Sequence, residues 1–260
     1  PGRARRRDTG TLGGRLALVI PSGPVRVAAA KEWRYLRRDP RLRAQILGSV
    51  ASICILGFVG VNFLTGPYAP FLAVAAAWVA VTALVPNQFG PDGGSFWAYV
   101  VSPTDVAVVL AGKNALWALS GAAVALAAGI LGAVLGGTAA YLPAALMASM
   151  TVLLVWMAVG NLTSIFGAFP LPERQVMSSG AKNGRAIVVS LVGLAVSSAL
   201  TLPAAAALGL AILLAGALAS TLAALAGVCY AALLFRFAYR WARSEVFARR
   251  LILVEVLDRP

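Results

Sequence analysis

Six long apolar stretches that contain no Asp, Glu, Lys or Arg limit what this chain can fold into. They cover residues 46–64, 69–86, 114–137, 142–168, 186–202 and 204–235. A helix needs about 20 predominantly apolar residues to cross a bilayer core of about 30 Å. Hydrophobic residues make up 60% of the chain and charged residues only 12%, so lipid is the expected solvent of most of it. The sequence therefore predicts an all-α, polytopic membrane protein with six transmembrane helices.

The basic residues lie on one side of such a six-span arrangement. Twelve Lys and Arg precede the first stretch, one lies in the second connection, three lie in the fourth and six follow the last stretch, whereas the other connections hold none. Because Lys and Arg mark cytoplasmic loops, both termini and the second and fourth connections are expected in the cytosol. The outer turns are then the neutral residues 65–69, 138–141 and 201–203.

The formal net charge of +13 would suggest a nucleic-acid partner in a soluble protein. Here the cations flank apolar stretches, so we interpret them as contacts to anionic membrane lipids and expect no nucleic acid. Arg outnumbers Lys by 19 to 3, which with abundant Ala and Gly is typical of GC-rich bacterial genomes. A bacterial plasma membrane is the expected location.

The charge and turn patterns divide the chain into four segments. We expect a flexible basic linker or tail at 1–24, an amphipathic connecting helix at 25–45, a six-span domain at 46–235 and a basic cytosolic tail at 236–260. The chain begins at Pro1, and we interpret it as a piece of a longer polypeptide. The last apolar stretch is longer than one tilted span needs, so a short re-entrant or interfacial helix is expected at 204–210.

The segment before the first span is predicted to form a helix with two faces. One stripe is apolar (Val25, Ala29, Trp33, Leu36) and the opposite one is basic (Lys31, Arg34, Arg38). Asp39 and Pro40 should end or kink this helix. Such a helix is expected to lie in the inner interface plane, with its apolar stripe among acyl chains. It is either a plain topology anchor or a lever against which a cytosolic partner docks.

The second connection, residues 86–113, holds more structure than a simple turn requires. Four Gly and Pro residues break the second span (Gly90, Pro91, Gly93, Gly94). Asp92 or Ser95 can cap a short helix that is expected to expose an aromatic face, formed by Phe96, Trp97 and Tyr99. Pro103 ends that helix, and Thr104 or Asp105 can cap a second one that leads to Lys113 and the third span. The aromatic side chains either fill a partner's socket or lie in the interfacial belt.

Two of these segments resemble the permease subunits of type-two ABC exporters. They are Lys-Glu-Trp-Arg-Tyr-Leu-Arg-Arg-Asp-Pro-Arg at 31–41 and, at 87–113, Asn-Gln-Phe-Gly, Asp-Gly-Gly-Ser-Phe-Trp, Pro-Thr-Asp and Gly-Lys. The resemblance also covers the six-span layout. It implies a cytosolic coupling helix between spans 2 and 3, which sits in a groove of a separate ATP-binding subunit.

The resemblance assigns residues to both elements by position. The connecting helix would include Lys31, Glu32, Trp33, Arg34 and Arg38. The ATPase-coupling element would include Phe89, Asp92, Ser95, Phe96, Trp97 and Tyr99. The implied partners are a cytosolic ABC ATPase dimer and a second six-span permease half, which is an identical copy, a related subunit or part of the same polypeptide.

The sequence lacks the groups that would supply energy within the chain itself. It holds no Gly-x-x-x-x-Gly-Lys-Ser/Thr loop, and Ala111–Asn114 lacks both the spacing and the hydroxyl that nucleotide binding needs. No Asp, Glu or His lies in an apolar stretch to relay protons. We therefore expect no enzymatic activity, catalytic residue, metal or cofactor in this chain, and expect ATP and Mg²⁺ to bind through the partner ATPase.

The implied function is export of an amphipathic or lipophilic substrate, such as a drug, an antibiotic or a lipid. The alternatives are an ATP-independent channel or carrier and a non-transporting membrane scaffold. By family analogy the pathway residues would be Trp78, Thr82, Ser190, Ser197 and Ser198. Ser and Thr in membrane helices also commonly bond their own i−4 carbonyl, which is the alternative for these hydroxyls.

Two further groups of residues bear on helix packing. Small residues recur every four positions in the third span, which predicts a close packing face unless chance produces the stripe: Gly121, Ala125, Gly129, Ala133 and Gly137. Asn62 and Asn161 lie within apolar stretches and need polar partners, which a neighbouring helix is expected to supply.

Overall fold

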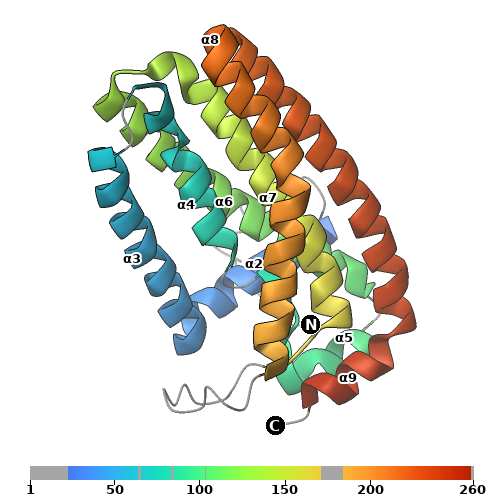
Figure 1. The fold of residues 1–260 in the computed structure, drawn as a ribbon. Coiled ribbons are helices and arrows are strands. Elements are labelled where there is room, and N and C mark those ends of the chain that lie inside the picture. Colours follow the sequence, from blue (N-terminus) through green and yellow to red (C-terminus); the bar gives the residue numbers. More distant parts are fainter. Residues whose placement is uncertain (1–22, 64–65, 83–84, 103, 171–183, 259–260) are drawn as a thin grey trace, which may run out of the picture.

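The computed structural model describes residues 23–63, 66–82, 85–102, 104–170 and 184–258, so most of the expected linker at 1–24 lies outside it. All regular secondary structure of the described residues is helical (Figure 1). The elements are α2 (Gly23–Arg38), α3 (Pro40–Phe63), η1 (Gly66–Phe71), α4 (Leu72–Thr82), η2 (Val85–Asn87), η3 (Gly90–Phe96), α5 (Trp97–Val101), α6 (Val106–Gly136), η4 (Ala139–Tyr141), α7 (Leu142–Phe166), α8 (Gly184–Ala248) and α9 (Arg250–Asp258).

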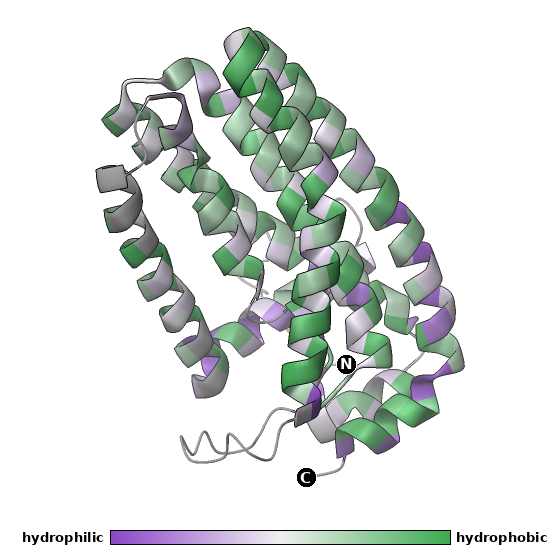
Figure 2. Ribbon diagram, viewed as in Figure 1, coloured by the Kyte–Doolittle hydropathy of each residue, from purple (hydrophilic) through white to green (hydrophobic). Residues whose placement is uncertain are grey.

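Four helical runs among the described residues are long and apolar enough to cross a membrane. They are Gly66–Val101, Val106–Gly136, Ala139–Phe166 and Gly184–Ala248. Their length and composition are those of a membrane protein, as the sequence predicts. The most hydrophilic residues gather at the end of the bundle that holds α2, α5 and α9 (Figure 2).

The centre of the bundle is made by α4, α6 and α7, with α8 packed on α7. Its core consists mainly of small and branched apolar residues, joined by Trp156 and Met157. The predicted packing face on α6 is confirmed for four residues, because Gly121, Ala125, Gly129 and Ala133 are buried. A Cβ atom added at Gly121 would lie 2.5 Å from Leu153 Cδ2 on α7. Gly137 differs, since it ends α6 with a φ of 63°.

The break between the first two helices lies where the sequence predicts it. α2 ends at Arg38, and α3 begins at Pro40. Pro40 fits there because the first turn of a helix needs no backbone N–H donor. The backbone N–H of Arg43 donates to the Asp39 carbonyl at 3.1 Å. A single residue, Asp39, therefore connects α2 to α3.

The prediction of a turn at 201–203 is wrong. Thr201, Leu202 and Pro203 lie inside α8, and the expected re-entrant helix at 204–210 simply continues it. The chain instead reverses at Gly216, whose φ of 77° and ψ of −167° are not helical. Figure 1 shows the resulting ascending arm (184–215) and descending arm (217–248) as a hairpin. A proline can remain inside a membrane helix when nearby side chains and backbone adjust to the missing N–H.

The residues after 235, read from the sequence as a tail, are helical as well. The descending arm of α8 continues to Ala248, and α9 then folds back beneath the bundle (Figure 1). Leu253 and Leu257 of α9 are 2% exposed and pack against Phe89 and Phe96. The C-terminal segment therefore covers the connection between α4 and α6.

Candidate functional site

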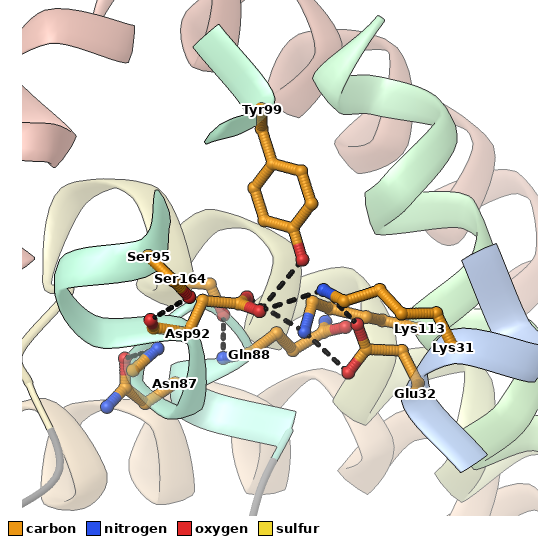
Figure 3. A network of polar contacts seen from close by, with 10 residues as sticks. Lys31, Glu32, Asn87, Gln88, Asp92, Ser95, Tyr99, Lys113 and Ser164 are labelled. Carbon is orange, nitrogen blue, oxygen red and sulfur yellow. Dashed lines mark hydrogen bonds and ion pairs between the residues drawn. The ribbon is translucent and has the colours of Figure 1, made fainter. Parts of the chain in front are cut away.

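Four charged side chains from three elements meet in one buried cluster (Figure 3). This charge cluster consists of Lys31 and Glu32 on α2, Asp92 on η3 and Lys113 on α6. Lys113 Nζ lies 2.8 Å from Glu32 Oε2 and 3.0 Å from Asp92 Oδ2. Lys31 Nζ lies 3.1 Å from Asp92 Oδ1 and 3.2 Å from Glu32 Oε1. Each cation therefore contacts both carboxylates.

The burial of this cluster makes its charge balance important. The side chains of Asp92 and Lys113 are 1% and 2% exposed, so neither can be solvated by bulk water. Removal of one partner of a buried ion pair typically costs about 3–5 kcal/mol, because an uncompensated charge remains. Two cations and two carboxylates cancel formally, and so the cluster is stable only when α2, η3 and α6 are all in place.

Tyr99 connects the short helix α5 to the same cluster. Its hydroxyl donates to Asp92 Oδ1 at 2.8 Å. Lys31 Nζ lies 4.4 Å from the centre of the Tyr99 ring and 4.5 Å from that of Tyr35, which adds two cation–π contacts. The coupling element that the sequence predicts is therefore attached to α2 through side chains on both elements.

The backbone lets these elements approach closely. A Cβ atom at Gly112 of α6 would lie 2.5 Å from the Ala28 Cβ of α2. Gly93 within η3 has a φ of 48° and a ψ of −138°, a conformation that L side chains rarely adopt. These two glycines allow α2 to lie directly on α6 and allow η3 to present Asp92 to both lysines.

A second polar cluster ties the same connection to α6 and α7. Gln88 Nε2 donates to Asn114 Oδ1 at 3.2 Å and to Asn161 Oδ1 at 3.0 Å. The backbone N–H of Gln88 donates to Ser164 Oγ at 2.8 Å. Asn161 thus has a polar partner, as the sequence predicts, but the expected neighbouring helix is wrong because Gln88 lies in the connection between η2 and η3. The side chain of Asn62 lies outside the described residues.

The exposed aromatic face that the sequence predicts for this connection is largely absent. Phe96, expected as part of that face, is completely buried together with Phe89, and their ring centres lie 5.2 Å apart. Tyr99 is half-buried by its contact with Asp92. Trp97 alone of the three remains exposed, at 56%. The reason is α9, whose leucines cover Phe96 and which hydropathy alone identifies only as a tail.

The capping predictions for this connection have mixed outcomes. Neither Asp92 nor Ser95 caps a helix, because the Asp92 carboxylate enters the charge cluster and Ser95 Oγ donates to the Asp92 carbonyl. Asp105 does cap α6, since its Oδ1 accepts the backbone N–H of Ala107 at 2.9 Å. The helix that follows is continuous with the third span. It begins at Val106, so Lys113 lies two turns inside it.

The predicted faces of the connecting helix are rotated in the structure. The buried residues of α2 are Ala28, Ala29, Glu32 and Leu36. Trp33 is half-buried and packs beside Leu36, whereas Arg34 and Arg38 are exposed as expected. The expectation that the apolar stripe lies among acyl chains is wrong for this face, since it packs on α6. Lys31 belongs to the charge cluster instead of the outer basic stripe because Asp92 attracts it.

One of the predicted pathway residues, Trp78, lines a pocket among the described residues. A largely apolar pocket of about 530 Å³ lies between α4, α7 and α8, and Trp78 forms part of its wall. Thr82 Oγ1 donates to the Val79 carbonyl instead, at 3.1 Å. Ser190 and Ser198 are exposed on the ascending arm of α8, and Ser197 is buried. Thr201, which the sequence analysis does not select, lines the pocket and bonds the Ser197 carbonyl at 2.7 Å.

No group of three or more His, Cys, Asp and Glu side chains that could hold a metal occurs in the part of the chain that the structure describes. The two carboxylates of the charge cluster are already neutralised by lysines. Comparisons with protein-family models, curated proteins and solved structures give no match to this chain.

Proposed function

We propose that this chain is the membrane subunit of an ATP-driven ABC exporter. In this proposal it forms half of a translocation pathway for an amphipathic or lipophilic substrate, and a second six-span half and a cytosolic ATPase dimer complete the machine. The crossing segments are α3, the run from η1 to η2, α6, α7 and the two arms of α8. Both termini lie in the cytosol of a bacterium, and the hydrophilic end in Figure 2 faces that side.

The observation that carries this proposal is the charge cluster. It joins the short helical element η3–α5 to α2 through Lys31 and Asp92, and to α6 through Lys113 and Asp92. A push on α5 is therefore transmitted to α2 and to the whole 31-residue length of α6. Such an attachment suits an element that receives motion from a separate subunit, because charged side chains held by several contacts resist sliding.

The pocket between α4, α7 and α8 supports the substrate class. Its volume of about 530 Å³ lies within the range of about 300–1,000 Å³ that accommodates drug-sized ligands. Its wall consists mainly of Ala, Gly and other apolar residues, with Trp78 and Tyr68 at positions that remain 40% and 42% exposed. An apolar wall with two hydrogen-bonding aromatic side chains favours a lipophilic molecule that carries one or two polar groups.

The energy source in this proposal is external. ATP and Mg²⁺ are held by the ATPase dimer, and this chain contributes no catalytic residue. The apolar stretches contain no Asp, Glu, His, Lys or Arg, and coupling to protons usually requires an acidic residue or a histidine within the membrane.

The proposal is tested by reconstituting the chain with each candidate ABC ATPase subunit from the same genome. ATP hydrolysis and the efflux of a lipophilic fluorescent dye are measured for wild type and for Trp97→Ala, with Val27→Ala as the control, since Val27 is also an exposed apolar residue. We expect Trp97→Ala to reduce dye-stimulated hydrolysis at least severalfold and the control to leave it unchanged. Dye transport by the chain alone would indicate a channel or carrier. An ATPase rate that no dye alters would indicate a scaffold.

A further inference from the structure

A small cavity lies beside the charge cluster, at the connection between α4 and α6. Three polar side chains line it, which are Glu32 of α2, Gln88 of the connection and Lys113 of α6. They are 8%, 2% and 2% exposed, so bulk water does not solvate them. Figure 3 shows the three side chains beside one another within the polar network. The rest of the wall is mainly apolar and consists of Leu36, Leu42, Pro91, Leu116 and Trp117.

One end of the Gln88 amide has no partner among the described residues. Gln88 Nε2 donates to Asn114 Oδ1 and Asn161 Oδ1, and we refer to these three residues as the amide cluster. Gln88 Oε1 is buried and accepts no hydrogen bond from the part of the chain that the structure describes. Such an acceptor loses its hydration on folding and gains nothing in return. The asparagine Nδ2 atoms are unpaired as well, but neither asparagine lines the cavity.

The orientation of the amides does not change this deficit. If all three amide groups are rotated by 180°, Gln88 Oε1 accepts from both asparagines and the two bonds between the side chains are kept. Gln88 Nε2 is then the unpaired end, at the same place. The cavity therefore faces an amide end that needs a partner able either to donate or to accept.

The ion pairs of the charge cluster leave bonding capacity on the other two polar side chains. The Lys113 ammonium group carries three N–H donors, and in the described part of the chain Glu32 and Asp92 take up two of them. Each carboxylate oxygen of Glu32 contacts one lysine, and a carboxylate can accept about four hydrogen bonds. Lys113 can therefore donate once more, and Glu32 can accept once more.

The size and the charges of the cavity determine what fits into it. Its volume is about 10 Å³, and a buried water needs about 10–15 Å³ and about two to four polar partners. A metal cation there would be repelled by the Lys113 ammonium group, and an anion would be repelled by the Glu32 carboxylate. A neutral water meets neither repulsion, and it can both donate and accept.

We propose that this cavity binds one structural water, which accepts from Lys113 Nζ and donates to Gln88 Oε1 and to the Glu32 carboxylate. This water joins the charge cluster to the amide cluster. Because Gln88 also bonds Asn161 of α7, the network then extends from α2 through the connection to α7. A bridging water is enthalpically nearly as favourable as a direct hydrogen bond. The bridge is independent of any transport function or ATPase partner.

The test is an experimental map of the whole chain in nanodiscs, at a resolution that shows ordered solvent. We expect one solvent peak at about 2.7–3.2 Å from Lys113 Nζ and from the unpaired end of the Gln88 amide. Gln88→Met keeps the length of the side chain and removes the amide, so it should lose the peak. The control is Ser164→Ala, which removes the acceptor of the Gln88 backbone N–H but leaves the cavity wall unchanged. It should keep the peak.

Three results would overturn the inference. The first is a wild-type map in which other buried waters are visible but this cavity holds no peak, a result that needs no variant to fold. The second is a peak with several oxygen neighbours at about 2.3–2.6 Å, which marks a metal cation. The third is a peak that persists in Gln88→Met, because the water then hydrates the ion pairs alone and does not connect the two clusters. Thermal unfolding verifies that both variants fold.

Discussion

Asp92 is the residue on which the arrangement of the hydrophilic end depends most. Its two carboxylate oxygens contact Lys31, Lys113 and the Tyr99 hydroxyl, and so connect four elements of the fold. Its side chain is 1% exposed. In a loop rich in glycine, an aspartate is more often a cap or a solvated turn residue. Its role here follows from the two lysines that the tertiary fold brings to it.

Loss of the Asp92 charge is expected to destabilise the protein strongly. In Asp92→Asn, the buried Lys113 keeps only Glu32 as a charged partner, and we expect a loss of about 3–5 kcal/mol in unfolding free energy. The double variant Asp92→Asn with Lys113→Met removes the stranded cation and should recover part of that loss. Thermal unfolding in nanodiscs measures both. A single variant as stable as wild type, or a double variant no better than the single one, would contradict the assigned pairing.

At the scale of single residues, the sequence identifies the members of the charge cluster better than the contacts between them. Lys31, Glu32 and Asp92 are assigned to elements by the resemblance, whereas Lys113 belongs to its Gly-Lys motif without an assigned role. Their pairing requires α2 to lie on α6 with Glu32 inward. The predicted apolar stripe omits Glu32, although two of its residues, Ala29 and Leu36, are buried beside it. A charged residue on a buried face can be recognised only when its partner's position is known.

Among the elements, α8 departs most from what the sequence predicts. The sequence predicts a turn at 201–203 because Thr201 and Pro203 interrupt a long run that is rich in Ala and Leu. The actual reversal at Gly216 lies between apolar residues on both sides, so hydropathy gives no signal there. Gly216 is distinguished only by a backbone conformation that other residues rarely adopt.

Substitution of Gly216 should therefore be costly in a way that other glycines of the same helix are not. We expect Gly216→Ala to lower the unfolding free energy by about 1–3 kcal/mol, because alanine is strained at this φ and ψ. Gly209→Ala is the matched control, since it lies inside α8 with no atom within 4 Å of an added Cβ. The control should leave stability unchanged or raise it slightly. Equal effects of the two substitutions in thermal unfolding would refute the hairpin at Gly216.

Other elements follow the sequence closely. The C-terminal end of α6 and both ends of α7 lie near those of the predicted spans, and both the break before Pro40 and the Asp105 cap are confirmed. These features depend on residues a few positions apart, so local chemistry determines them. The burial of Phe89 and Phe96 depends on α9, which lies more than 150 residues away along the chain. No local pattern reveals such a contact.

On the scale of the whole molecule, the bundle combines an apolar pocket with a charged base. The pocket lies between α4, α7 and α8, whereas the charge cluster joins α2, η3 and α6. Helices α6 and α7 pack against α4 along the core between them. In the proposed function, motion at the base reaches the pocket through the packing of α6 and α7 against α4. The family analogy places the pathway along the second and fifth spans, which are α4 and the ascending arm of α8, and both line the pocket. It does not include the descending arm, which joins the wall through the hairpin of α8.

Filling the pocket should separate substrate binding from attachment to the ATPase. Ala205 lines the pocket, so Ala205→Trp should occupy part of it and abolish most of the dye-stimulated ATP hydrolysis. Ala206→Trp is the control, since the neighbouring alanine is exposed and lies outside the pocket wall. Copurification with the ATPase should persist for both. If Ala205→Trp responds to dye like Ala206→Trp does, the pocket is not the substrate site.

The neutral pairing at the base of the bundle also has a practical consequence for anyone who wishes to shorten this protein. Trimming the chain to its apolar helices discards Glu32 and Lys31 together with α2, and leaves Lys113 and Asp92 at a newly opened surface without half of their counter-ions. A fragment intended for expression and biophysics should accordingly retain everything from Gly23 onward.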